Sequence, residues 1–178
     1  MRTITVRFIT LGCKTNIYES EAMAQLFEKS GHTVVPNGCA DIIVVNTCTV
    51  TGTGASKSIK LIRRARRENP NAVLAVTGCL AQTEADRLRA AENIDVLIGT
   101  SGRREIVKLC EDAAAGKKTD SVGDILHETS FEELGIVRGQ HRIRAEIKIE
   151  DGCNNFCSYC KIPYARGPVR SRDIKNIA

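Results

Sequence analysis

The chain has 178 residues, a formal net charge of +5 and eight cysteines. Eight cysteines would suggest a disulfide framework in a secreted protein, but the first eleven residues alternate polar and apolar and form no signal peptide. The longest apolar runs, 42–45 and 72–76, are far shorter than the ~18 residues that cross a bilayer. The composition therefore predicts a soluble, cytoplasmic protein with reduced cysteines and no membrane contact.

From residue 1 to about residue 115, short β-rich runs alternate with helical stretches. The predicted strands are 6–11, 42–47, 73–77 and 96–99, with a further short strand within 32–36. The predicted helices are 18–30, 54–69, 84–91 and 103–115. Because alternating strands and helices imply right-handed crossovers, we expect an α/β fold. Its sheet should be doubly wound and largely parallel, with helices on both faces.

The first predicted helix carries a signal at each end. Asn16 followed by Glu19 has the form of a capping box, in which two side chains satisfy backbone N–H groups of the first turn. Gly31 stands where the helix should stop, because glycine readily adopts the left-handed conformation found after helix C-termini. We therefore expect the helix to start at this box and to end before Gly31.

The remainder of the chain divides into a polar linker and a second segment. Residues 116–140 show no clean periodicity and predict a linker with at most one short element. Residues 143–149 alternate like a strand and run directly into a cysteine-rich loop. Barrel enzymes place their chemistry at such strand ends. We therefore predict a first domain at 1–115, a linker at 116–140, and at 141–178 the first strand of a (β/α) barrel from a longer enzyme.

Three cysteines lie close together in that loop, which reads Gly152-Cys-Asn-Asn-Phe-Cys-Ser-Tyr-Cys160. Thiolates at this spacing can bind three corners of a 4Fe–4S cluster and leave the fourth iron open. Ferredoxins normally supply a fourth cysteine, and structural zinc also takes four ligands. The spacing of Cys153, Cys157 and Cys160 therefore favours an open-iron cluster, with zinc or incidental thiols as the alternative.

A second set of cysteines follows three different predicted strands. Cys13 follows the first strand, Cys48 the run 42–47, and Cys79 the run 73–77. Because the carboxyl ends of parallel strands meet at one edge of a sheet, we expect these cysteines to converge there. The alternative is that they are ordinary buried thiols, which are common in protein cores.

Several segments resemble one family of enzymes. The cysteine loop, continued by Ile162-Pro-Tyr-Ala-Arg-Gly167, is similar to the cluster loop of radical S-adenosylmethionine (SAM) enzymes. Within those enzymes, its residue sequence most resembles that of the methylthiotransferases. Their N-terminal domain has three cysteine motifs like those found here, which read Thr10-Leu-Gly-Cys-Lys-Thr-Asn16, Val45-Asn-Thr-Cys-Thr-Val-Thr51 and Val76-Thr-Gly-Cys-Leu-Ala-Gln82. The resemblance covers nearly the whole chain.

The resemblance implies two 4Fe–4S clusters. Cys153, Cys157 and Cys160 would hold the cluster that binds SAM, and Cys13, Cys48 and Cys79 would hold an auxiliary cluster. Cys39 and Cys110 match no family motif and are interpreted as ordinary thiols. No catalytic residue beyond the ligands can be assigned, because the SAM contacts expected from the family lie past Ala178. Lys161 departs from the family pattern, which often has an aliphatic residue there.

The resemblance also implies a reaction. One SAM would donate a methyl group to sulfur at the auxiliary cluster, and another would be cleaved to a radical that abstracts hydrogen from the base. Lys14 in the first motif is typical of enzymes acting on threonylcarbamoyladenosine beside the tRNA anticodon. The implied partners are tRNA and a reductant such as flavodoxin or ferredoxin. Alternatives are an enzyme for isopentenyladenosine or for a ribosomal-protein aspartate, and a non-catalytic iron–sulfur module that binds RNA.

Charge gives weaker support for a nucleic-acid partner. Lys57, Lys60, Arg64 and Arg67 share one face of a predicted helix, opposite Ala55, Ile59 and Ile62. Such a stripe can contact phosphates, although a solvated outer face is the plainer interpretation. A second basic set lies beside the cysteine loop, where we expect RNA to approach: Lys161, Arg166, Arg170 and Arg172.

Overall fold

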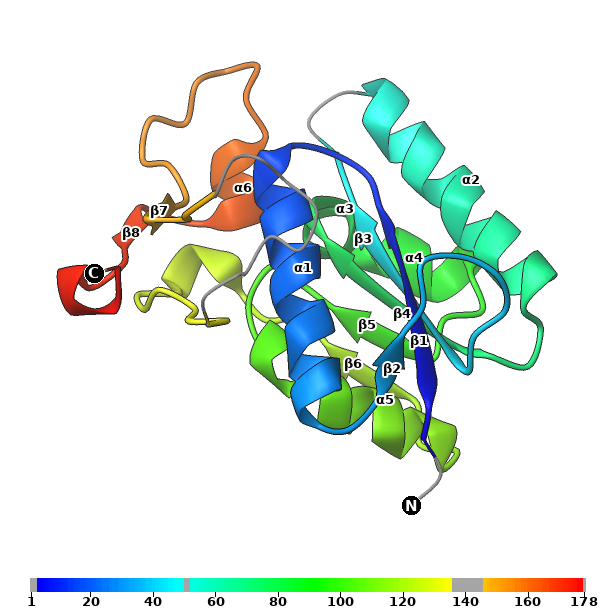
Figure 1. The fold of residues 1–178 in the computed structure, drawn as a ribbon. Helices are drawn as coiled ribbons and strands as arrows, with labels where there is room; N and C mark the ends of the chain where they lie inside the picture. The colour runs from blue at the N-terminus through cyan, green and yellow to red at the C-terminus, as the bar shows by residue number, and fades with distance from the viewer. Residues whose placement is uncertain (1–2, 50–51, 136–145, 178) are drawn as a thin grey trace.

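The computed structural model describes residues 3–49, 52–135 and 146–177 (Figure 1). A six-stranded sheet with the order β2-β1-β3-β4-β5-β6 forms its centre, and every neighbouring pair is parallel. Its strands are β1 (Thr5–Thr10), β2 (Thr33–Val34), β3 (Ile42–Thr47), β4 (Val73–Gly78), β5 (Val96–Ile98) and β6 (Thr119–Ser121). The predicted doubly wound α/β class is confirmed.

Helices cover both faces of this sheet (Figure 1). One face carries α1 (Lys14–Lys29) and α5 (Ile106–Ala114), the latter preceded by the short 3₁₀ helix η1 (Arg103–Glu105). The other face carries α2 (Gly52–Glu68), α3 (Cys79–Thr83) and α4 (Ala85–Ala91). Across the described residues no helix is both long and apolar enough to span a membrane.

The central strands explain why two faces are covered. All six residues of β3 are buried, with Ile42 and Val44 in the core beneath α1 and α5, and Ile43 and Val45 in the core beneath α2. Because successive side chains of a strand point to opposite faces, a strand covered on both sides is apolar throughout. This continuous apolar run is what the sequence shows at 42–45.

The amphipathic pattern of α2 is also confirmed. Ala55, Ile59 and Ile62 are buried against the sheet. The four basic residues of the opposite stripe are exposed, namely Lys57, Lys60, Arg64 and Arg67. The helix packs through its apolar face and presents the basic face outward.

The start of α1 differs from the prediction. The helix begins at Lys14, Cys13 occupies the N-cap, and no side chain caps it. Asn16 and Glu19 are completely buried inside the helix rather than acting as a capping box, so that prediction is wrong. At the other end the prediction is confirmed, because Ser30 is the C-cap and Gly31 follows with φ +84°.

The sheet continues beyond residue 115. Strand β6 pairs with β5 within the segment predicted as a linker, and the 3₁₀ helix η2 (Ile125–His127) follows it. The three residues of β6 are Thr, Asp and Ser, and two of them are exposed. A polar edge strand has no apolar alternation by which a sequence pattern could reveal it.

The predicted strand at 143–149 requires a correction. Residues 146–149 form no strand, and residues 143–145 lie outside the described part of the chain. The strand is instead β7 (Glu150–Asp151), which pairs antiparallel with β8 (Arg170–Ser171) on either side of the cysteine loop and α6 (Ile162–Arg166). A strand exists only where a partner satisfies its backbone groups, and here the chain itself supplies the partner by folding back. The short 3₁₀ helix η3 (Ile174–Asn176) follows.

Candidate metal centres

The structure brings Cys13, Cys48 and Cys79 to one edge of the sheet. Strands β1, β3 and β4 are adjacent and parallel, with Thr10 in register with Asn46 and Thr47 with Gly78. Cys48 and Cys79 come directly after β3 and β4, and Cys13 lies at the N-cap of α1. The loop after β1 passes close to Cys48, because a Cβ placed on Gly12 would lie 3.0 Å from the Cys48 Cβ. The predicted convergence of three strand ends is therefore present in the fold.

These three thiols differ in environment. Cys13 is exposed, whereas Cys48 and Cys79 are buried. Burial raises the pKa of the Cys79 thiol, while the neighbouring Arg166 guanidinium acts in the opposite direction. The edge thus has a buried inner wall and an open outer side.

Buried side-chain amides hold the loops that carry these cysteines. Asn16 Nδ2 donates to Leu11 O at 2.8 Å and to Thr47 O at 2.9 Å, which joins the end of β1 to the end of β3. Asn46 Nδ2 in turn donates to Asn16 O at 2.9 Å. Asn16 therefore joins the ends of β1 and β3, and Asn46 joins β3 to α1, which fixes these loops relative to one another.

The hydroxyl of Ser58 binds both backbone groups of Cys48, its N–H and its C=O. Ser58 Oγ of α2 accepts from Cys48 N at 3.1 Å and donates to Cys48 O at 3.0 Å. Sequence reasoning missed this role, because a serine ten residues away carries no local signal of such a contact.

Glycines make the approach to two of the cysteines possible. Gly78, before Cys79, has φ +96°, and a Cβ there would lie 2.4 Å from Asn46 Oδ1 and 2.5 Å from Thr47 O. Gly152, before Cys153, has φ +87°, and a Cβ there would lie 2.0 Å from Pro168 O. Only glycine tolerates both the positive φ and the close contact. The Gly-Cys pairs in the sequence were the signal that could have revealed this constraint.

The triplet loop between β7 and α6 is held by its backbone. Cys153 N donates to Gly167 O at 3.0 Å, and Cys160 N donates to Cys157 O at 2.9 Å. Cys160 Sγ accepts from Ile162 N at 3.5 Å, the kind of backbone contact that tunes cluster thiolates. Cys157 is exposed, and the other two triplet cysteines are partly buried.

Each set offers sulfur donors only, which suits an iron–sulfur cluster better than a hard cation. Among the described residues, no three cysteine, histidine or carboxylate side chains lie close enough to hold a metal ion. The fold therefore places two sets of three thiols without assembling either into a ligand cage, and their assignment as ligands stays a prediction.

The triplet segment docks on the first domain through a buried ion cluster centred on Glu19. Glu19 is completely buried, and its carboxylate lies 2.6 Å from Arg103 Nη1, 2.7 Å from Lys148 Nζ and 3.1 Å from Arg166 Nη2. Burial by itself would raise the pKa of Glu19, but Arg103, Arg166 and Lys148 together hold it well below its usual range. Helices α3 and α6 pack together beside this cluster, and Thr100 Oγ1 donates to Ala165 O at 2.6 Å.

The predicted basic approach surface beside the loop is largely wrong. Arg166, Arg170 and Arg172 are buried, with 4%, 6% and 8% of their surface exposed, and their charges are used internally. Arg170 lies 3.7 Å from Asp151, and Arg172 lies 2.8 Å from Glu133. Of the four basic residues only Lys161 is exposed.

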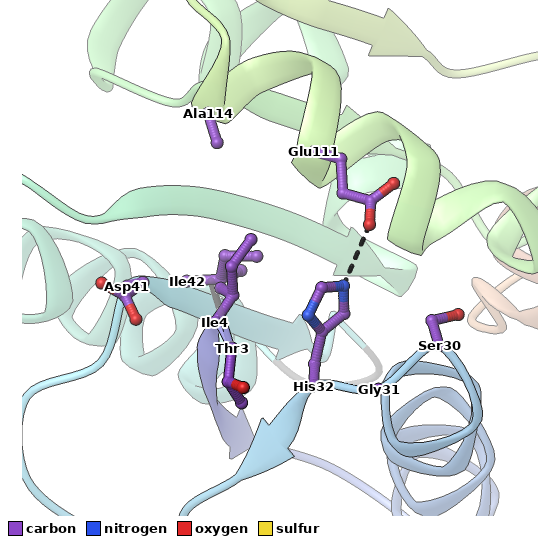
Figure 2. A pocket seen from close by; sticks show the side chains of 9 residues that line it. All are labelled: Thr3, Ile4, Ser30, Gly31, His32, Asp41, Ile42, Glu111 and Ala114. Carbon is purple, nitrogen blue, oxygen red and sulfur yellow. Dashed lines mark hydrogen bonds and ion pairs between the residues drawn. The ribbon is translucent and has the colours of Figure 1, made fainter. Parts of the chain in front are cut away.

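The domain has two hollows of similar size, one near each end of the sheet. One of about 690 Å³ lies beside the triplet loop, where its lining includes Cys160, Tyr164 and Gln82. The other, of about 710 Å³, lies at the opposite end of the sheet, where His32 Nε2 and Glu111 Oε1 are 3.0 Å apart (Figure 2). Among the described residues that line the second hollow there is no cysteine, whereas Cys160 lines the first.

A parallel α/β sheet with a cysteine beyond each of three adjacent strands is the arrangement that the resemblance to methylthiotransferase N-terminal domains implies. The chain belongs to the family described as "Uncharacterized protein family UPF0004", whose model matches residues 5–99. The matched region contains Cys13, Cys48 and Cys79 and ends before the triplet.

Relatives extend the similarity over almost the whole chain. The threonylcarbamoyladenosine tRNA methylthiotransferase of Bacillus subtilis is 43% identical over 175 residues, which cover 97% of this chain and 39% of that protein. The enzyme of the same name from Aquifex aeolicus is 37% identical over 174 residues, 97% of this chain and 42% of that protein. The tRNA-2-methylthio-N(6)-dimethylallyladenosine synthase of Porphyromonas gingivalis is 33% identical over 175 residues, which cover 94% of this chain and 38% of that protein. The chain thus spans about two fifths of the length of these curated relatives.

Proposed function

We propose that this chain is part of a tRNA-modifying enzyme that inserts a methylthio group at C2 of threonylcarbamoyladenosine beside the anticodon. The observation that carries the proposal is the meeting of Cys13, Cys48 and Cys79 at one sheet edge, with the triplet segment docked next to it. Two cysteine triads held close together are what a reaction needs when one centre activates a substrate and the other presents sulfur.

Each triad has a proposed role. Cys153, Cys157 and Cys160 would bind a 4Fe–4S cluster that takes SAM at its open iron, and Cys13, Cys48 and Cys79 would bind the auxiliary cluster. When bound, these groups supply one-electron cleavage of SAM and the sulfur that is transferred. The chain's own contribution is geometric: Gly78 and Ser58 set the backbone of the buried cysteines, and burial on the inner side excludes water. The proposed partners are tRNA and a one-electron reductant such as flavodoxin or ferredoxin.

We propose the domains as predicted, with one adjustment. The first domain would carry the auxiliary cluster, and its sheet extends through β6 to Ser121. The segment from residue 141 would begin the radical-SAM domain.

Lys14 supports threonylcarbamoyladenosine as the substrate over dimethylallyladenosine. It is exposed directly after Cys13, and its ammonium group makes no hydrogen bond or ion pair with another described residue. The threonylcarbamoyl group carries a carboxylate, whereas the dimethylallyl group is an uncharged hydrocarbon. An unpaired ammonium beside the reaction centre suits the first substrate, because a charge-assisted contact favours a carboxylate and gives nothing to a hydrocarbon.

Metal analysis tests the cofactor part of the proposal. The anaerobically reconstituted chain should contain two 4Fe–4S clusters, about eight iron and eight sulfide. Alanine at Cys13, Cys48 and Cys79 should remove one cluster, and alanine at the triplet should remove the other. Cys39→Ala and Cys110→Ala are matched controls that should leave the iron content unchanged. Stoichiometric zinc without the broad visible absorption of a cluster would refute the assignment.

Nucleoside mass spectrometry tests the substrate. Transfer RNA from a deletion strain should lack the methylthio derivative of threonylcarbamoyladenosine and keep that of isopentenyladenosine. Complementation with Lys14→Gln should restore much less product than complementation with Lys14→Arg, which keeps the charge. Loss of only the isopentenyl derivative in the deletion strain would show that the substrate is wrong while the chemistry stands.

A further inference from the structure

Arg166 physically joins the two cysteine sites. It ends α6, only six residues after Cys160, and its side chain is 4% exposed. Its guanidinium reaches into α1, where Nη2 donates to Asn16 Oδ1 at 2.8 Å and to Glu19 Oε2 at 3.1 Å, and Nη1 contacts Glu19 Oε1. Helix α6, which Arg166 ends, packs against α3, the helix that begins at Cys79. The triplet segment therefore contacts both the helix that follows Cys13, through the Arg166 side chain, and the helix that begins at Cys79, through α6.

The charges around Arg166 do not balance. Among the described residues, the cluster joins four cations to three carboxylates, namely Arg103, Lys148, Arg166 and Arg170 with Glu19, Glu132 and Asp151. An uncompensated buried charge is costly, so an anion is expected next to the cluster. The thiol of Cys79 marks where that anion would lie. A 4Fe–4S cluster bound by three thiolates carries a single net negative charge in its oxidised form and would supply it.

We infer that Arg166 is a positioning residue that holds the triplet loop against the cysteine edge and supplies the positive charge beside Cys79. The identity of the bound cluster rests on the proposed function, whereas the docking of α6 is a property of this chain alone. A positive charge next to a cluster stabilises its more negative reduced form, so Arg166 raises the reduction potential of the auxiliary cluster.

Three variants separate the two roles. Arg166→Gln removes both the charge and the forked donor, and Arg166→Lys keeps the charge but loses the fork. Lys175→Gln is the matched control, because Lys175 lies in the same segment but is exposed to solvent.

The first readout is hydrogen exchange of the chain without metal. Amides of Cys153, Ala165 and Gly167 donate within the triplet segment, so they report its docking. Both Arg166 variants should raise the exchange rates of these amides on the order of a hundredfold, as expected when a buried ion pair is broken. Lys175→Gln should leave them within about threefold of the unchanged protein, because local openings respond to the contacts that hold them. Unchanged protection in Arg166→Gln would overturn the docking role.

The second readout is the reduction potential of the auxiliary cluster in the reconstituted full-length protein, followed by electron paramagnetic resonance. Arg166→Gln should shift the potential to a more negative value or lose that cluster, whereas Arg166→Lys and Lys175→Gln should retain both the cluster and its potential. Equal potentials in Arg166→Gln and the unchanged protein would overturn the charge role while leaving the two-cluster proposal intact. Failure of the unchanged protein to bind any cluster would instead refute the proposed function and the charge role, and hydrogen exchange would still decide the docking role.

Discussion

Replacement of Glu19 by glutamine should lower the free energy of unfolding by about 3 kcal/mol, because it breaks the centre of a buried ion cluster. The carboxylate is completely buried and contacts three cations. Glutamine keeps the shape and one acceptor oxygen but removes the charge that the cations share. Each cation retains a second partner, since Arg103 keeps Glu132 and both Lys148 and Arg166 keep Asp151. The expected loss therefore lies at the lower end of the ~3–5 kcal/mol typical for a broken buried pair.

Urea denaturation followed by circular dichroism measures this loss. Glu68→Gln is the matched control, because Glu68 pairs with Arg64 on the exposed surface of α2 and its loss should leave the unfolding transition nearly unchanged. A loss below about 1 kcal/mol for Glu19→Gln would refute the reasoning, since the cations would then be stabilised without this carboxylate.

The same variant has a pH signature. The pKa of Glu19 is held below its usual range in the folded protein, so the unfolded chain binds the proton first as pH falls. Its contribution is complete above the unfolded pKa of about 4.3 and is lost progressively below it. The stability difference between the unchanged protein and Glu19→Gln should therefore be constant near neutral pH and shrink in acid. A difference that grows in acid would contradict the assigned ionisation.

Two further predictions concern buried positions in the first domain. Gly78→Ala should lower the free energy of unfolding, measured in urea, by at least about 3 kcal/mol, because the added Cβ would meet backbone atoms at a positive φ. Gly38→Ala is the control: Gly38 has φ +89° but open space around it, so this variant should lower the free energy of unfolding by only about 1 kcal/mol. Equal losses would show that close contact at Gly78 does not matter. Burial raises the pKa of the Cys110 thiol, so iodoacetamide should label exposed Cys39 in the folded protein and reach Cys110 only after unfolding, as read by mass spectrometry. Labelling of both at equal rates would contradict the buried position.

Features that depend only on residues close together in the chain were predictable from the sequence. The apolar run 42–45 predicted a strand buried on both faces, and the placement of Cys13, Cys48 and Cys79 after strands predicted their common edge. Both inferences use the short periods of strands and the fixed polarity of a parallel sheet. A local pattern is enough to predict these two features, because strand periodicity and strand direction can each be read from a few consecutive residues.

Only the tertiary structure decided what the charged and polar residues do. Asn16 and Glu19 have the spacing of a capping box, and Arg166 looks like part of a basic surface. All three are buried, and Arg166 contacts both of the others. Arg166 and Glu19 lie 147 residues apart in the chain. A charge is buried only when partners from distant segments compensate it, and no local pattern records those partners. The sequence by itself therefore determined the strands and where their cysteines meet, while the fold determined which charges hold the second cysteine set beside the first.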